Sequence, residues 1–149
     1  MIDGIKITPL RQILDERGKV MHMLRADAEH FIAFGEIYFS TVDHGVVKGW
    51  QQHTKMHLNY AVISGKIKLV LFDDRKESPS HGEIQEFFMG PDNYFLLTVP
   101  PFIWYGFKGL STEPAIIANC ATIPHEQGEA VKKATTTPDI PYDWNTLNR

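Results

Sequence analysis

Short runs of β-branched and aromatic residues recur along almost the whole chain, and several of them alternate apolar with polar side chains. Alternation with a period of two is typical of strands that bury one face. We predict seven strands, which cover residues 31–42, 46–53, 58–64, 66–73, 83–89, 93–99 and 115–122. The segments between them are rich in Gly, Pro, Asp, Asn and Ser, which favour turns. Many short strands at short spacing predict an all-β sandwich or barrel.

Helix signals are weak. Residues 27–34, DAEHFIAF, and residues 125–134, HEQGEAVKKA, could each form one or two turns of a short peripheral helix. Gly128 weakens the second of these segments because glycine disfavours helix interiors. The Pro-rich tail, residues 135–149, is expected to lie over the surface of the domain or over a neighbouring subunit.

One stretch departs from simple alternation. In VKGWQQHTKMHLNY, residues 47–60, every second position is polar or titratable: Gly49, Gln51, His53, Lys55, His57 and Asn59. If the strand is continuous, these residues share one face. That face could be the wet side of an outer strand, as is common in antiparallel sheets. Alternatively, it could face a ligand inside a barrel, because a buried polar row is costly without partners.

Composition narrows the class of protein. A chain of 149 residues, 43% hydrophobic and 22% charged, suits a single domain over residues 1–149. A net charge of −3 argues against a nucleic-acid partner. Cys120 is the only cysteine, so neither an internal disulfide nor a cysteine zinc site is expected. No apolar run approaches the length of a membrane helix, and the charged N-terminus is unlike a signal peptide, so we expect a cytoplasmic protein without membrane contact.

Glycines frame the polar row at positions 45 and 65, with His53 between them, and Pro100 opens the later segment PPFIWY. This spacing resembles the two cupin motifs, G-x5-H-x-H-x4-E-x6-G and P-x-G-x-x-H. Gln51, Leu58 and Tyr105 replace three of the four metal ligands, and Phe102 replaces the motif glycine. A transition metal requires three or four ligands. The resemblance implies a cupin, a jelly-roll barrel, and we expect it to hold no metal and no cofactor.

Five segments then occur in a characteristic order: ILDERGKV, GVVKGW, SGKIKLVLFDDRKESPSHGE, LTVPPFIWYGFKGLS and IPYDW. Together they resemble the dTDP-4-dehydrorhamnose 3,5-epimerase family, metal-free cupins that act on nucleotide-linked 4-keto-6-deoxy sugars. The resemblance implies a cofactor-independent isomerase in deoxysugar and polysaccharide biosynthesis. Its substrate would be a nucleotide sugar, and the reaction would remove a proton beside the C4 ketone and pass through an enolate.

The resemblance also implies roles for individual residues. His53 becomes the general base, and histidine suits this role because its ordinary pKa of about 6.5 lies near working pH. Lys48 or Lys55, with His57, would stabilise the enolate, which needs a cation or strong donor. Arg17 would bind the diphosphate of the substrate held in the neighbouring subunit through charge-assisted hydrogen bonds. This role implies a homodimer.

The remaining candidates line the same expected pocket. Glu36 and Tyr38 share one face of a strand on which the family places nucleotide contacts, and we expect them to bind substrate. Gln51 and Asn59 belong to the polar row, and we expect this row to face the substrate inside the barrel. Lys48 stands at the position of a family arginine and is assigned to substrate binding.

Two departures from the family keep alternatives open. Residues 115–124 contain no tyrosine where the family has its general acid, near Ala118, and the family's C-terminal extension, which carries an aspartate that orients the histidine, is absent. Tyr105, from a different wall of the barrel, is the candidate donor. The enzyme could invert one carbon only or use another nucleotide sugar.

Two other functions remain as alternatives. Residues 48–65 also align without gaps on a motif of the dTDP-4-keto-6-deoxyglucose 3,4-ketoisomerases, so a ketoisomerase is one of them. The other is a non-catalytic cupin that binds a sugar nucleotide.

Overall fold

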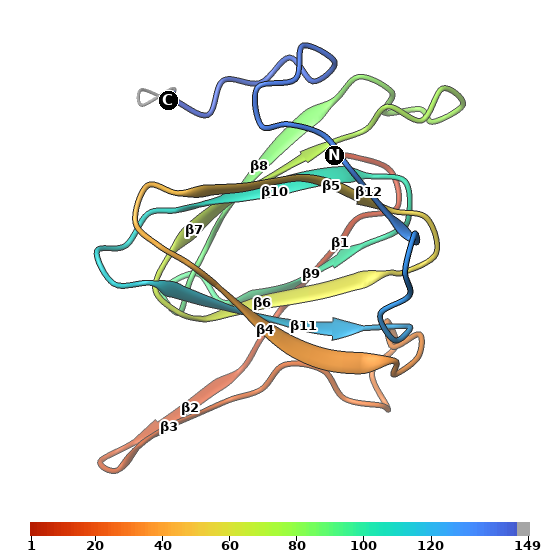
Figure 1. Cartoon of the computed structure of the whole chain (residues 1–149). Coiled ribbons are helices and arrows are strands. Elements are labelled where there is room, and N and C mark those ends of the chain that lie inside the picture. The colour runs from red at the N-terminus through yellow and green to blue at the C-terminus, as the bar shows by residue number, and fades with distance from the viewer. Residues whose placement is uncertain (146–149) are drawn as a thin grey trace.

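The computed structural model describes residues 1–145, which form strands and turns without a helix (Figure 1). The twelve strands are β1 Lys6–Pro9, β2 Gln12–Asp15, β3 Gly18–Met21, β4 Glu36–Val42, β5 Val47–His53, β6 Leu58–Ser64, β7 Ile67–Phe72, β8 Ile84–Met89, β9 Phe95–Val99, β10 Trp104–Gly109, β11 Ala115–Ala121 and β12 Ala130–Lys132. Across residues 1–145, the structure contains no helix able to cross a membrane.

The all-β class is confirmed, and each of the seven predicted strands corresponds to an observed one, although β4 begins five residues later than predicted. The prediction of short peripheral helices is wrong. Residues 27–34 form turns followed by irregular backbone, and residues 125–134 contain a turn followed by β12. Neither segment has an apolar stripe at helical spacing, which is what would stabilise so short a helix through packing. Gly128 adopts a φ of +81°, which ends any helix at that position.

Two five-stranded antiparallel sheets face each other and enclose the core (Figure 1). The first sheet has the order β1-β9-β6-β11-β4, and the second has the order β12-β5-β10-β7-β8. A two-stranded hairpin, β2–β3, projects away from both sheets. The main core cluster draws side chains from both sheets and from the N-terminal segment at Ile2. This is the jelly-roll arrangement that the sequence predicts.

Alternation along each strand decides which side chains enter the barrel. On β10, Tyr105 and Phe107 belong to the interior cluster, whereas Trp104 packs on the outer face. On β5, Trp50 points outward, and its ring centroid lies 5.1 Å from that of Trp144 in the C-terminal tail. The described part of the tail therefore covers the outer face of the second sheet, while residues 146–149 lie outside the described residues.

Strands β5 and β10 approach each other unusually closely. A Cβ atom on Gly49 would lie 2.7 Å from the Cα atom of Gly106, and Gly49 has a φ of +149°. Only glycine combines this conformation with this proximity. The close pairing sets Gln51 opposite Tyr105. It thereby brings the end of β5 beside Tyr105.

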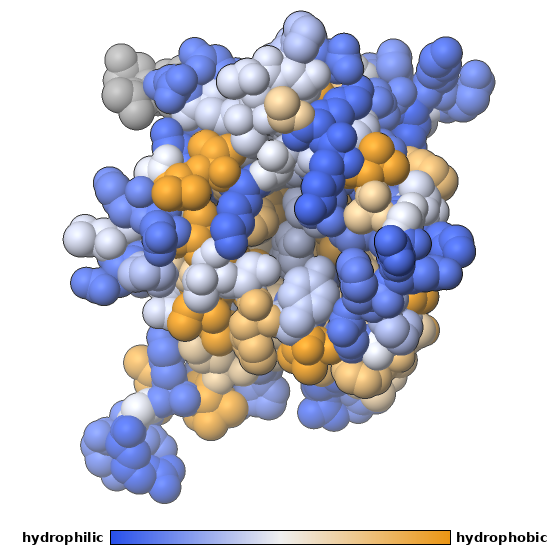
Figure 2. Space-filling model, in the orientation of Figure 1, coloured by the Kyte–Doolittle hydropathy of each residue, from blue (hydrophilic) through white to orange (hydrophobic). Residues whose placement is uncertain are grey.

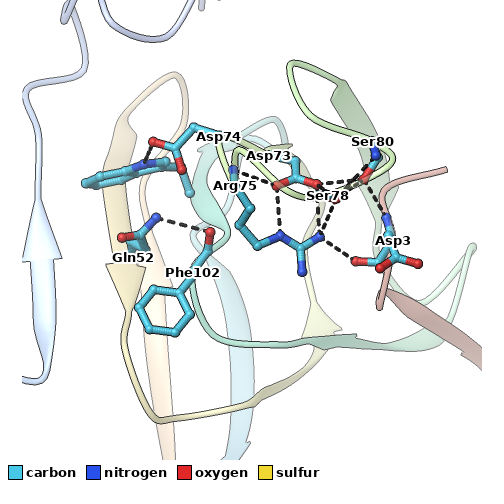
Figure 3. Close-up of polar contacts among 9 residues, drawn as sticks. Asp3, Gln52, Asp73, Asp74, Arg75, Ser78, Ser80 and Phe102 are labelled. Carbon is cyan, nitrogen blue, oxygen red and sulfur yellow. Dashed lines mark hydrogen bonds and ion pairs between the residues drawn. The ribbon is translucent and has the colours of Figure 1, made fainter.

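The turn between β7 and β8 is organised around one buried carboxylate, that of Asp73 (Figure 3). Arg75 donates to it from Nε at 2.8 Å and Nη2 at 2.9 Å, and the hydroxyls of Ser78 and Ser80 each donate at 2.6 Å. Burial alone would raise the pKa of Asp73, but these hydrogen bonds hold the pKa well below its ordinary value. Arg75 also donates to the backbone oxygen of Asp3, which ties the N-terminus to this turn.

We expect the substitution Asp73→Asn to lower the free energy of unfolding by about 2–4 kcal/mol, because it removes a charge that accepts hydrogen bonds from five donors, the backbone N–H of Arg75 included. The lowered pKa in the folded state means that the carboxylate stabilises the fold above pH 4, and that this contribution is lost as the pH falls further. Urea denaturation should therefore show a difference from the unsubstituted protein that is full at pH 7 and shrinks between pH 4 and pH 2. The exposed Asp92→Asn serves as the control, and an equal effect of both substitutions would contradict this account.

Candidate active site

Two adjoining cavities occupy one end of the barrel interior. The outer cavity, of about 340 Å³, is lined by Glu36, Tyr38, Gln51, His53, Met56 and His125. The inner cavity, of about 170 Å³, is lined by Tyr38, Ser40, Lys48, Gly49, Gln51, Tyr60, Tyr105 and Phe107. Tyr38 and Gln51 line both cavities, which makes them parts of one concave site. A concave site with convergent polar groups is the usual form of a small-molecule site.

His53 is the most constrained side chain of this site. It ends β5, is 6% exposed, and its Nδ1 lies 2.5 Å from Oε1 of Glu129, which is also buried. A carboxylate can only accept, so Nδ1 carries the proton of this bond. In the neutral ring Nε2 is then unprotonated and able to accept a proton. The histidine is thus held in the tautomer that a base needs.

Glu129 is itself fixed by the backbone. Its second carboxylate oxygen accepts from the amides of Thr54 at 2.8 Å, Lys55 at 2.9 Å and Met56 at 3.1 Å. Burial would raise the pKa of Glu129, but the hydrogen bonds from His53 and the amides lower it to about 2. Glu129 is therefore ionised at neutral pH and stabilises positive charge on the imidazole.

The loop before β10 anchors the same end of β5. Phe102 donates its backbone N–H to the carbonyl of His53 at 2.8 Å, and its own carbonyl accepts from Nε2 of Gln52 at 3.1 Å (Figure 3). Phe102 has a φ of +68°, the left-handed conformation that usually selects glycine. The residue that replaces the cupin glycine therefore keeps a glycine-like backbone and locks the strand end at which His53 stands.

The other ring nitrogen of His53 faces a tyrosine. Nε2 lies 3.0 Å from Oη of Tyr105, and the two rings are stacked with an interplanar angle of 12°. Since Nε2 accepts, the Tyr105 hydroxyl donates to it. The Tyr60 ring packs edge-on against the Tyr105 ring, with 5.8 Å between the ring centroids. Burial raises the pKa of both tyrosines, so both phenols are protonated at neutral pH.

Six of the ten predicted site residues come together at these cavities. His53 and Tyr105 are in direct contact, and Gln51 and Tyr38 line both cavities. Glu36 lines the outer cavity and accepts from the backbone N–H of His125 at 2.8 Å. The sixth residue, Lys48, lies on β5 and lines the inner cavity. Its Nζ donates at 2.6 Å to the carbonyl of Thr41 on β4.

The structure does not extend the polar row beyond His53. Strand β5 ends there, the chain turns around Glu129, and β6 restarts in the opposite phase, with Tyr60 facing the core. Asn59 therefore points to the outer face, where its amide donates to the carbonyl of Cys120 and its oxygen accepts from Thr98. The predicted contact of Asn59 with substrate is not supported, because both ends of its side chain are already bonded.

Three further predicted residues lie away from the cavities. Lys55 is exposed and pairs with Glu126 at 3.4 Å, because it stands in the turn that wraps Glu129. His57 lies outside both cavities, and partial burial lowers its pKa. Arg17 is at the tip of the β2–β3 hairpin, 84% exposed and paired with Asp15.

Sequence reasoning missed the carboxylate that orients His53. The orienting group was expected to be lost with the C-terminal extension, yet Glu129 supplies it from the turn before β12. Glu129 lies 76 residues after His53 in a segment that we predicted as helical, so no spacing in the sequence connects the two. Asn119, whose amide donates to Oη of Tyr38 at 2.8 Å, was also missed. Within residues 1–145, no group of His, Cys, Asp and Glu side chains has the arrangement of a metal site.

Comparison with known proteins gives consistent matches. The family model for dTDP-4-dehydrorhamnose 3,5-epimerase matches residues 1–149. A solved dTDP sugar isomerase from Desulfovibrio desulfuricans G20 is 44% identical, with a TM-score of 0.95 over 99% of this chain and 94% of that one. The probable low-salt glycan biosynthesis epimerase Agl13 of Haloferax volcanii is 30% identical over 95% of this chain and 89% of its own. The spore coat polysaccharide biosynthesis protein SpsL of Bacillus subtilis is 30% identical over 98% of both chains.

We expect Glu129→Gln to reverse the tautomer of His53. The glutamine oxygen should keep the three backbone donors, which turns its NH2 group towards Nδ1 and moves the imidazole proton to Nε2. Nitrogen-15 NMR of the histidine ring distinguishes the two tautomers. Glu126→Gln, which alters only an exposed ion pair, should leave the ring unchanged. Persistence of the Nδ1 proton in Glu129→Gln would contradict this role of the carboxylate.

Proposed function

The chain belongs to the dTDP-4-dehydrorhamnose 3,5-epimerase family, and we propose that it inverts a carbon beside the C4 ketone of a dTDP-linked 4-keto-6-deoxyhexose. The observation that carries this proposal is a buried histidine whose tautomer is fixed by a carboxylate and whose Nε2 lies at a cavity. A proton next to a ketone is weakly acidic, and a positioned imidazole is a suitable base for it. The reaction needs no cofactor in this scheme.

His53 starts the proposed reaction. The substrate displaces the Tyr105 hydroxyl from Nε2, and Nε2 then removes the proton from the carbon next to the ketone. The electrons of the broken C–H bond form the enolate, with the negative charge on the C4 oxygen. Glu129 stabilises the imidazolium that results, so its charge acts in the transition state without any change of position.

The enolate oxygen requires a donor within the cavity. Lys55 and His57 were expected to serve here, but they lie outside both cavities. Lys48 and Tyr105 line the inner cavity, and each can donate to an oxyanion. We therefore assign stabilisation of the enolate to Lys48 and Tyr105, with Glu36, Tyr38 and Gln51 as further contacts for the substrate.

The choice of a dTDP sugar rests on the relatives. The Desulfovibrio protein, at 44% identity, is described as a dTDP sugar isomerase, and the Haloferax relative as an epimerase of glycan biosynthesis. We propose that residues 1–149 act as one domain, because one core cluster joins the N-terminal segment to both sheets. A cytoplasmic location is proposed from the sequence, and the unpaired Cys120 agrees with a reducing compartment.

We also propose that the protein works as a homodimer. The projecting β2–β3 hairpin exposes Leu14 (70%) and Val20 (59%), and the outer face of the edge strand β4 exposes Ile37 and Phe39. Apolar side chains reach the surface in the lower half of Figure 2, on the side of the hairpin. Exposed apolar surface on a projecting arm and an edge strand favours association. In the dimer, Arg17 at the tip of the arm would reach the diphosphate of the partner's substrate.

Loss of the base should abolish proton exchange. We expect the unsubstituted protein, given dTDP-4-keto-6-deoxyglucose in heavy water, to introduce deuterium at C3 or C5, as seen by proton NMR. His53→Asn should slow this exchange by about 10²–10⁴-fold, because the general base is removed. The exposed His81→Asn is the control. Full exchange in His53→Asn would eliminate the assigned base. A carbonyl at C3 in carbon NMR would identify a ketoisomerase, and binding of the substrate without exchange would identify a non-catalytic cupin.

A mixing experiment tests the contribution of Arg17 across the interface. We expect Arg17→Ala and His53→Asn to be inactive as separate homodimers, but mixed dimers should contain one intact site. Random pairing of equal amounts gives roughly a quarter of the original activity. Light scattering measures the dimer, and the exchange assay measures the activity. Inactive mixtures, a monomeric protein, or full activity of Arg17→Ala would each rule out the shared site.

A further inference from the structure

Inversion at a carbon requires proton transfer on two opposite faces of the substrate. The enolate is planar at the reacting carbon, so a base that returns the proton to the face it came from regenerates the starting sugar. A second group must supply a proton from the other side. This step rests on the proposed epimerase function, and the structure allows the second group to be identified.

Tyr105, the donor expected from the sequence, stands on the same side as the base. His53 is on β5 and Tyr105 on β10, which are paired neighbours within the second sheet. Their side chains touch at 3.0 Å. Tyr105 does stand on a different wall from Ala118 of β11, as expected, but that wall is the one that also carries the base. Tyr60 lies on the first sheet, but it lines only the inner cavity, whereas His53 lines the outer cavity.

Tyr38 meets the geometric requirement. It lies on β4, an edge strand of the first sheet, and its alternation on this strand turns it into the barrel. It lines the outer cavity together with His53 and the inner cavity together with Tyr105. The two sheets face each other (Figure 1), so a sugar in this site lies between His53 and Tyr38.

The hydrogen bond of Tyr38 leaves its proton available. Nδ2 of Asn119 donates to Oη of Tyr38 at 2.8 Å, so the phenol accepts in this bond and does not use its own proton. Within residues 1–145, the Tyr38 hydroxyl donates no hydrogen bond to another side chain. Tyr105, by contrast, donates its proton to Nε2 of His53.

Local electrostatics are compatible with a proton donor. Burial raises the pKa of Tyr38, and the hydrogen bond from Asn119 counteracts the increase in part. The phenol is therefore protonated at neutral pH, and the Asn119 amide is already in place to stabilise the phenolate after the proton has left.

The strand register explains why no tyrosine is needed on β11. Asn119 faces the barrel interior and is paired with Tyr38 of the neighbouring strand β4. Adjacent strands are about 5 Å apart. A phenol on β4 therefore reaches the same part of the cavity as a side chain on β11, and Asn119 holds it there.

We propose that Tyr38 is the catalytic acid that returns a proton to the face of the sugar opposite His53. The C–H bond on the His53 side breaks, and its proton goes to Nε2. A new C–H bond forms on the Tyr38 side with the phenol proton, while the electron pair of the enolate returns to carbon. One proton then leaves His53 for solvent, and one proton from solvent restores Tyr38, so the cycle balances without a co-reactant.

The test separates exchange from inversion. The unsubstituted protein and Tyr38→Phe are given dTDP-4-keto-6-deoxyglucose in heavy water, and proton NMR records deuterium at C3 and C5 together with the coupling constants of the epimer. We expect Tyr38→Phe to keep exchange within a few-fold of the original rate, because His53 still removes and returns the proton on its own face. Formation of the epimer should fall by about 100-fold or more.

Two further variants keep the test decisive. Tyr94→Phe, whose hydroxyl donates to the carbonyl of His22 away from the cavities, is the matched control. Asn119→Asp retains the Tyr38 phenol but replaces the N–H donor with a carboxylate, which accepts a hydrogen bond from the phenol and so engages its proton. It should therefore also exchange without inverting. This second variant remains informative if thermal melting shows that Tyr38→Phe is unfolded.

Each outcome has one meaning. Inversion by Tyr38→Phe at the original rate, or a parallel loss of exchange and inversion in the folded variant, overturns the assignment of Tyr38 and leaves the epimerase function standing. Absence of both exchange and inversion in the unsubstituted protein overturns the proposed function and the role of Tyr38 with it.

Discussion

The contact between Glu129 and His53 is the constraint on which the rest of the site depends. One carboxylate oxygen accepts from the imidazole, and the other accepts from three consecutive backbone amides. A buried carboxylate with four donors remains charged, and its charge fixes the histidine tautomer. The same amides form the loop that ends β5 and begins β6. The contact therefore sets both the chemistry of the base and the change in strand phase that closes the polar row.

Because the two sheets face each other, side chains reach the candidate active site from two opposite sides. The second sheet contributes His53 and Tyr105, and the first contributes Tyr38 and Tyr60. Burying a polar group inside a barrel costs free energy unless the group is hydrogen-bonded. Here one hydrogen-bonded chain runs from Glu129 through His53 to Tyr105, and a second joins Asn119 to Tyr38. Pre-bonded side chains keep their positions before substrate arrives, which reduces the cost of ordering them during the reaction.

The outer face of the second sheet is covered by the C-terminal tail, whereas the outer face of the first sheet exposes apolar side chains. The tail packs Ile140 and Trp144 over Trp50 and Val70, so the outer face of the second sheet is a small core of its own. The first sheet leaves Ile37 and Phe39 exposed at its β4 edge, near the side from which the β2–β3 hairpin projects. This asymmetry favours the first sheet as the surface of the proposed homodimer. The hairpin that carries Arg17 makes few contacts with the rest of its own chain.

The sequence by itself determined the all-β class and seven of the strands, because alternation and turn residues act locally. Alternation also placed Gln51 and His53 on one face of a strand, but it did not decide whether that face pointed inward, which was implied only by the family resemblance. Only the tertiary structure decided where the polar row ends, because the reversal of phase between His53 and Asn59 depends on a loop folded around Glu129, 76 residues away. It also decided that Tyr105 shares a sheet with the base and that Tyr38 faces it. Which strands become neighbours, and which side chains then meet across a barrel, depends on long-range pairing that has no periodicity in the chain.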